Sequence, residues 1–175
     1  MSDSVFWIPG TWPGRLGIVL RPRGGDWLED EIRVWKAAGI DGVVSALTPG
    51  EVRELELGAE GTFCEALGIR FRSFPIPDRG VPSAVEAVRG LVADLTASLE
   101  AGHNVVAHCR QSIGRAAIIV ALVLTSSGQD PARAFEAVEK ARGCPVPDTA
   151  EQRVWVEAVA GRLRLTGVPA HQACE

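Results

Sequence analysis

The chain has 175 residues, of which 46% are hydrophobic and 23% charged, and its formal net charge is −4 at pH 7. This length fits one domain whose core needs no metal or disulfide, and the composition is that of a globular rather than a disordered protein. The acidic balance excludes the broad basic surface that binds nucleic acid or anionic membranes. We therefore expect neither nucleic acid nor a membrane among its partners, and we expect a monomer.

Short apolar segments bounded by glycine and proline predict the strands of a sheet, at residues 5–8, 16–20, 42–47, 69–74 and 104–108. Apolar residues at helical spacing predict helices between and after them, at residues 26–38, from 49 onward, 60–67, 83–99, 116–124, 131–142 and 150–165. Polar pairs typical of capping boxes mark four helix starts: Asp26 with Glu29, Thr48 with Glu51, Ser83 with Glu86, and Thr149 with Gln152.

Strands that alternate with helices predict an α/β fold, with a central, mostly parallel sheet of about five strands and helices on both faces. We expect residues 1–165 to form a single domain and residues 166–175 to form a flexible tail. No secretory leader and no apolar run of about 20 residues is evident, so we expect a cytoplasmic protein.

The most informative stretch is His108-Cys109-Arg110-Gln111-Ser112-Ile113-Gly114-Arg115, which lies between an apolar strand and an apolar helix. A loop that ends at a helix N-terminus directs backbone N–H groups at one point and favours an anion there. The same field lowers the pKa of a thiol, so Cys109 is a candidate nucleophile. The planar guanidinium of Arg115 can bind two phosphate oxygens.

These residues resemble the signature loop of the cysteine-based protein tyrosine phosphatase superfamily, in its dual-specificity phosphatase-like branch of short, bacterial-type single domains. Residues 74–83, which contain Pro77-Asp78-Arg79-Gly80, resemble the mobile loop that carries the general acid of that family. Residues 147–152 resemble the segment whose glutamine orients the hydrolytic water. The resemblance covers residues 5–165 and implies a protein tyrosine or dual-specificity phosphatase with a phosphorylated protein or peptide as substrate.

The resemblance implies a role for each matching residue. Cys109 is the nucleophile, Gln152 the residue that positions water, and Arg115 the phosphate-binding arginine. Asp78 is the general acid of the first step and, once ionised, the base of the second. The loop amides of Arg110, Gln111, Ser112, Ile113, Gly114 and Arg115 bind phosphate, sulfate or vanadate, and His108 supports the loop. The reaction proceeds through a phosphocysteine and needs no cofactor and no metal.

Two positions depart from the family pattern. Ser112 stands where the family has glycine, and a backbone with positive φ would strain it. Ala116 stands where the family has a serine or threonine that stabilises the departing thiolate, so we expect the phosphoenzyme to be hydrolysed more slowly than it forms.

Other interpretations remain open. Asp78 could be a turn residue, Gln152 a helix cap, and Arg79 and Arg110 solvated arginines rather than groups that attract a phosphorylated segment. Cys64 and Cys144 could be packing residues or redox partners of Cys109. The chain could also be an impaired phosphate- or phosphoprotein-binding module (a pseudophosphatase), or a phosphoinositide or inositol-phosphate phosphatase.

Overall fold

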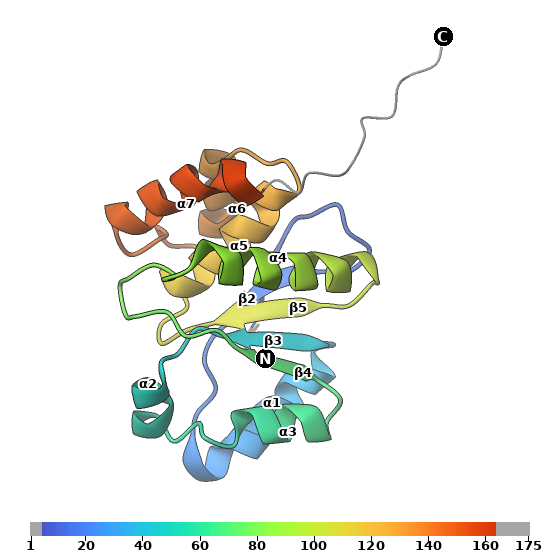
Figure 1. Cartoon of the computed structure of the whole chain (residues 1–175). Coiled ribbons are helices and arrows are strands. Elements are labelled where there is room, and N and C mark those ends of the chain that lie inside the picture. The colour runs from blue at the N-terminus through green and yellow to red at the C-terminus, as the bar shows by residue number, and fades with distance from the viewer. Residues whose placement is uncertain (1–4, 164–175) are drawn as a thin grey trace.

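We describe a computed structural model of the chain over residues 5–163 (Figure 1). Its centre is a sheet of five strands in the order β1-β2-β5-β3-β4. The strands are β1 (Val5–Ile8), β2 (Leu16–Val19), β3 (Gly42–Ser45), β4 (Arg70–Ser73) and β5 (Val105–His108). β1 pairs antiparallel with β2, and the remaining pairs are parallel. The predicted α/β class and mostly parallel sheet are confirmed.

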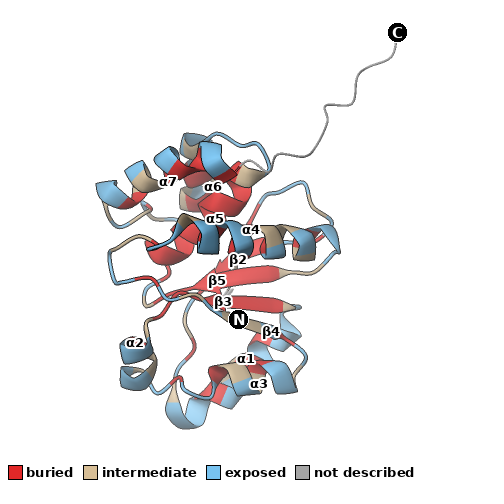
Figure 2. Ribbon diagram, in the orientation of Figure 1, coloured by how far each residue is buried: buried red, intermediate tan, exposed pale blue. Residues whose placement is uncertain are grey.

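Helices cover both faces of this sheet. They are α1 (Leu28–Ala37), α2 (Pro49–Glu54), α3 (Glu60–Ala66), α4 (Val85–Glu100), α5 (Arg115–Ser126), α6 (Pro131–Arg142) and α7 (Ala150–Leu163). In Figure 1, α4 to α7 lie on one side of the sheet and α1 and α3 on the other. Each side has its own cluster of buried apolar side chains, and the central strands β2, β3 and β5 are buried along their whole length (Figure 2).

Two of the four predicted capping boxes form. Thr48 caps α2 and Thr149 caps the start of α7, each with the expected residue three positions later. The other two predictions are wrong. The chain enters α1 through the 3-10 turn Gly25–Trp27, and α4 begins after Ala84, so that Ser83 lies outside the helix; neither Trp27 nor Ala84 caps its helix through its side chain.

Parallel strands bring their carboxyl ends to one edge of the sheet, where open α/β folds bind ligands. The loops that follow β3, β4 and β5 meet at this edge, and they carry the residues discussed below.

No helix among residues 5–163 is both long and apolar enough to cross a membrane. The expected C-terminal tail, residues 166–175, lies outside the described residues.

Candidate active site

The loop from Cys109 to Gly114 connects β5 to α5. Both elements are apolar and fully or almost fully buried, which fixes the two ends of the loop in the core. Cys109 begins the loop and is 2% exposed, whereas Arg115 is the first residue of α5. The helix N-terminus therefore points at the loop, and its unpaired N–H groups and dipole favour an anion or a thiolate there.

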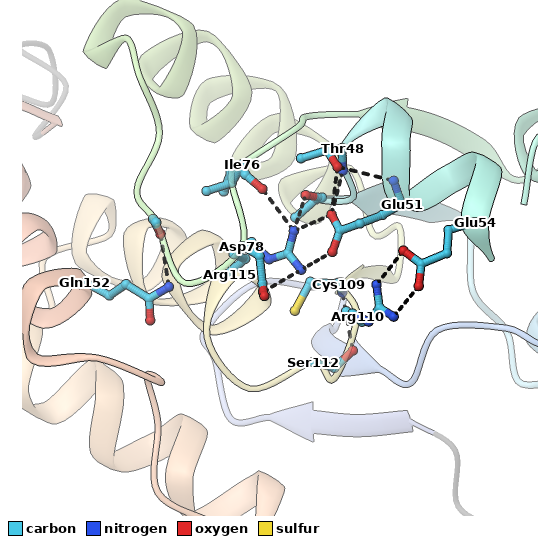
Figure 3. Close-up of polar contacts among 12 residues, drawn as sticks. Thr48, Glu51, Glu54, Ile76, Asp78, Cys109, Arg110, Ser112, Arg115 and Gln152 are labelled. Carbon is cyan, nitrogen blue, oxygen red and sulfur yellow. Dashed lines mark hydrogen bonds and ion pairs between the residues drawn. The ribbon is translucent and has the colours of Figure 1, made fainter.

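Ser112 adopts the left-handed backbone that glycine would accept without strain, with φ of 56°. Its side chain is buried, and its Oγ donates a hydrogen bond to the Val19 carbonyl at 2.7 Å. The same Oγ accepts a longer bond of 3.4 Å from the Cys109 amide (Figure 3). These bonds offset the backbone strain, and they tie the loop to the end of β2.

Glu51 of α2 holds Arg115 in place. The two carboxylate oxygens of Glu51 accept bonds of 2.7 and 2.8 Å from the two terminal nitrogens of the Arg115 guanidinium (Figure 3). One of these nitrogens also donates to the Ile76 carbonyl at 2.9 Å. Arg115 is 1% exposed, so its planar fork has a single orientation. From the sequence we assigned Glu51 a capping role alone. The contact with Arg115 could have been suspected, because Glu51 lies shortly after β3, whose carboxyl end is at the same edge of the sheet as the loop.

The charge state of the pair follows from these contacts. The hydrogen bond from Arg115 lowers the pKa of Glu51 to about 2, against the effect of burial. Burial disfavours the charged form of Arg115, but its bond to Glu51 and the nearby negative groups outweigh burial and raise its pKa. Both groups are therefore ionised at neutral pH, and Arg115 remains a cation that can bind phosphate.

Asp78 lies in the loop between β4 and α4, in a turn closed by the bond from the Gly80 amide to the Pro77 carbonyl. Arg79, the next residue, has φ of 57°. An Asp78 carboxylate oxygen lies 3.1 Å from the second terminal nitrogen of Arg115, and the Asp78 side chain is 63% exposed. The turn interpretation of Asp78 therefore holds together with its placement beside Arg115 at the end of the loop from Cys109 to Gly114.

A pocket of about 160 Å³ joins these segments. Its lining residues are Asp78, Arg79, Cys109, Arg110, Gln111, Arg115 and Asp148. All of these residues except Asp148 are candidates from the sequence. A larger cavity of about 550 Å³ lies between α4 and strands β3 and β4, and none of the predicted site residues line it. Within residues 5–163, no three His, Cys, Asp or Glu side chains are grouped so that they could hold a metal ion.

Gln152 lies beside the pocket rather than in its lining. Its side-chain oxygen accepts a bond from the Thr149 amide at 3.2 Å, which completes the capping box of α7. Its side-chain nitrogen donates to the Gly80 carbonyl at 3.0 Å (Figure 3), and the residue is fully buried. Gln152 thus links the start of α7 to the loop that carries Asp78.

Two polar side-chain pairs lie at the start of the loop from Cys109 to Gly114. His108 is buried with its Nε2 2.7 Å from a carboxylate oxygen of Glu60, in agreement with the hydrogen-bonding role expected for it. Arg110 at the rim pairs with both carboxylate oxygens of Glu54, at 2.6 and 3.1 Å (Figure 3), so it is not a free solvated arginine.

Arg142, at the end of α6, was not identified from the sequence. Its Nε donates to the Ser112 carbonyl at 2.9 Å and a terminal nitrogen donates to the Gln111 carbonyl at 3.4 Å. The guanidinium also stacks over the Phe6 ring, 4.1 Å from its centroid. Arg142 therefore holds the carbonyl groups of Gln111 and Ser112 by hydrogen bonds to its guanidinium.

Solved structures with this fold include several phosphatases. Kinase associated phosphatase, with serine in place of its catalytic cysteine, is 18% identical with a TM-score of 0.79, over 92% of this chain and 96% of that one. Tk-PTP in its active form is 24% identical with a TM-score of 0.75, over 93% and 99% of the two chains. PTPMT1 in complex with PI(5)P is 18% identical with a TM-score of 0.70, over 85% and 91%. At these identities the likeness establishes the fold.

No curated protein sequence matches the chain. A family model does: the one described as "Tc-R-P: Polymorphic toxin system, DSP-PTPase phosphatase" matches residues 19–129, which is more than half of the chain. The matched segment includes Asp78, Cys109 and Arg115, and it ends before Asp148 and Gln152. The chain therefore belongs to this family of dual-specificity-type protein tyrosine phosphatases.

Proposed function

We propose that the protein hydrolyses phosphomonoesters on a phosphorylated protein or peptide through a phosphocysteine intermediate. One observation carries this proposal: Cys109, Arg115 and Asp78 line one small pocket at the N-terminus of α5. A thiol, a fixed guanidinium and a carboxyl group are the nucleophile, the anion-binding group and the proton donor that phosphomonoester cleavage requires.

In the first step, the loop amides and Arg115 bind the nonbridging phosphate oxygens, and the Cys109 sulfur attacks phosphorus. The S–P bond forms as the P–O bond to the leaving group breaks, and Asp78 gives its proton to the leaving oxygen. Arg115 is oriented by Glu51 before the substrate arrives, so little reorganisation opposes this step. In the second step, water attacks phosphorus while the S–P bond breaks, and one water proton passes to the Asp78 carboxylate left by the first step. The Cys109 thiolate and inorganic phosphate are released.

The charges around the pocket favour a single phosphate group. Asp78 and Asp148 are both lining residues, and the Arg110 charge is balanced by Glu54. A headgroup with several phosphates would place its additional negative charges close to these carboxylates. This argument ranks a phosphorylated protein or peptide above an inositol phosphate, although the PTPMT1 structure contains PI(5)P.

The experiment is hydrolysis of an aryl phosphate in the presence of EDTA, with vanadate as competitor. We expect turnover by the wild type, its loss in Cys109→Ser, and a reduction of about 100-fold or more in Asp78→Ala. Cys144→Ser is the matched control, because this thiol does not line the pocket, and its turnover should equal that of the wild type.

The binding module is the second candidate, because Ala116 provides no hydroxyl at the start of α5. Vanadate binding without turnover in the wild type would favour it over the phosphatase.

A further inference from the structure

We propose that Asp148 selects substrates that carry a basic side chain next to the phosphorylated residue. This inference rests on the proposed function and deepens it, because it names the class of phosphopeptide that the pocket prefers. Asp148 lies outside residues 19–129, which the family model matches, and it was not a candidate from the sequence.

The position of Asp148 is the first argument. Its side chain lines the pocket that contains Cys109. A β-carbon added to Gly114 would lie only 2.1 Å from a carboxylate oxygen of Asp148, so the carboxylate rests against the last loop residue before Arg115. The residue is also exposed. A group in this place is close both to a phosphate bound by the loop and to the peptide residues on either side of that phosphate.

The second argument is that the Asp148 carboxylate is unpaired. Over residues 5–163 it makes no hydrogen bond or ion pair with another residue. The other acidic lining residue, Asp78, lies 3.1 Å from Arg115, and Arg110 at the rim is paired with Glu54. Of the two carboxylates in the lining, Asp148 is therefore the one whose charge is left for a group of the substrate.

The third argument is that Asp148 is held in place before a substrate arrives. Thr149 and Gln152 fix the first turn of α7 through two reciprocal bonds of 3.2 Å, and Asp148 immediately precedes that turn. Its short side chain loses little conformational freedom when it pairs with a ligand. Arg79 also lines the pocket and is exposed. Its long side chain must lose more rotamer freedom to hold an acidic group, so Asp148 contributes the stronger preference.

The bound phosphate strengthens the preference for a basic residue. A carboxylate beside a phosphate dianion repels it, which weakens binding. A lysine or arginine of the peptide that pairs with Asp148 cancels this repulsion, whereas a glutamate in the same place adds to it. The pocket therefore favours a phosphorylated residue with basic neighbours.

The test uses three phosphotyrosine peptides that differ only in the residues flanking phosphotyrosine, which are arginine, glutamine or glutamate on both sides. For the wild type we expect kcat/KM for phosphate release to be about 5-fold higher with arginine than with glutamine, the effect of one exposed ion pair, and lower again with glutamate. Asp148→Asn should hydrolyse the arginine and glutamine peptides with equal kcat/KM, and Asp148→Lys should favour the glutamate peptide. Glu151→Gln is the matched control, because this carboxylate is exposed in the same turn of α7 but outside the pocket lining, and it should keep the wild-type preference.

Equal kcat/KM of the wild type for the arginine and glutamine peptides would overturn the assignment of Asp148. A preference that Asp148→Asn retains would overturn it as well. So would a preference that Glu151→Gln loses to the same extent, since the effect would then be one of net charge.

Peptide binding separates a failure of this inference from a failure of the proposed function. The affinity of Cys109→Ser for the same peptides, measured by fluorescence anisotropy, does not depend on turnover. Suppose that the wild type releases no phosphate from any peptide, while Cys109→Ser binds the arginine peptide more tightly than the glutamine peptide and loses this preference when Asp148→Asn is added. The proposed function has then failed and the assignment of Asp148 stands. Turnover without the preference would leave the phosphatase standing and overturn the assignment.

Discussion

Glu51 and Arg115 form a two-point ion pair between α2 and α5, with both N···O distances below 3 Å and both residues buried. They lie 64 positions apart in the sequence. The pair orients the buried guanidinium of Arg115 at the start of α5, and the Glu51 carboxylate also caps α2 through the Thr48 amide at 2.9 Å. A single side chain therefore couples the start of α2 to the proposed phosphate-binding group, Arg115.

The first prediction concerns the loss of this carboxylate. Glu51→Gln removes the buried carboxylate that pairs with the Arg115 guanidinium and leaves it only the exposed Asp78, which costs about 3 kcal/mol in the free energy of unfolding. Vanadate affinity should fall as well, because the guanidinium is no longer held in one orientation. Urea unfolding and vanadate titration measure the two effects. Glu86→Gln, which removes an exposed i,i+3 partner of Arg89, should change neither by a measurable amount.

The second prediction is a pH dependence of stability. The pKa of Glu51 is lowered from its ordinary 4.5 to about 2 in the folded protein, chiefly by the hydrogen bond from Arg115. The unfolded chain therefore binds the proton at a higher pH than the folded one, and the stabilisation is fully present above about pH 4.5 and is lost as the pH falls toward 2. The free energy of unfolding, measured from pH 2 to 6, should decline less steeply in Glu51→Gln than in the wild type. Parallel curves would contradict the assignment.

The third prediction concerns Ser112. Ser112→Ala keeps a β-carbon at a φ of 56° and loses the bond to the Val19 carbonyl, so it combines strain with an unpaired buried group. We expect a loss of about 2 kcal/mol in the free energy of unfolding. Ser112→Gly loses the same bond but relieves about 1 kcal/mol of strain, so thermal unfolding should rank it between the wild type and Ser112→Ala. The reverse ranking would show that strain is not the deciding effect.

The fourth prediction concerns Ala116, which is completely buried at the start of α5. Ala116→Ser adds a hydroxyl that can stabilise the departing Cys109 thiolate, so the steady-state rate should rise while the burst rate stays unchanged. Each hydrogen bond to a charged group contributes about 1.5 to 3 kcal/mol, which corresponds to roughly a 10-fold increase at the lower value. Ala117→Ser is the control, because it places a hydroxyl in the same buried turn of α5 without the proposed contact to the thiolate, and its steady-state rate should not rise. A faster burst in Ala116→Ser would argue against this role.

The fifth prediction concerns Arg142, whose bonds to the Ser112 and Gln111 carbonyls hold the loop from outside the pocket. Arg142→Met removes both bonds and the guanidinium that stacks on Phe6, so kcat/KM and vanadate affinity should fall together by about 10-fold. Arg142→Lys, with one donor group in reach, should recover part of the loss. Arg133→Met on the exposed side of α6 should behave as the wild type. If Arg142→Lys is as impaired as Arg142→Met, hydrogen bonding is not the cause.

Local signals in the sequence were sufficient for much of the fold and for part of the site. The apolar runs before Cys109 and after Arg115 predict a strand and a helix with a short loop between them, and both elements form. The caps at Thr48 and Thr149 were also predicted, because the interacting atoms are only three residues apart. The cap predicted at Asp26 was wrong, since a contact distant in sequence, the bond from the Gly25 amide to the Glu56 carbonyl, fixes the chain just before α1. The cap predicted at Ser83 was wrong because Ala84, in extended backbone, is the residue that precedes α4.

The sequence alone was enough to place the proposed nucleophile and the proposed phosphate-binding arginine in one loop, because Cys109 and Arg115 belong to one continuous strand, loop and helix. The tertiary structure alone decided the partners of these residues: Glu51 on Arg115, Arg142 on the loop carbonyls, Glu60 on His108, and Asp148 rather than Gln152 in the pocket lining. The physical reason is that each of these contacts joins segments about 30 to 60 residues apart, which become neighbours only when the parallel strands bring their carboxyl ends to the same edge of the sheet.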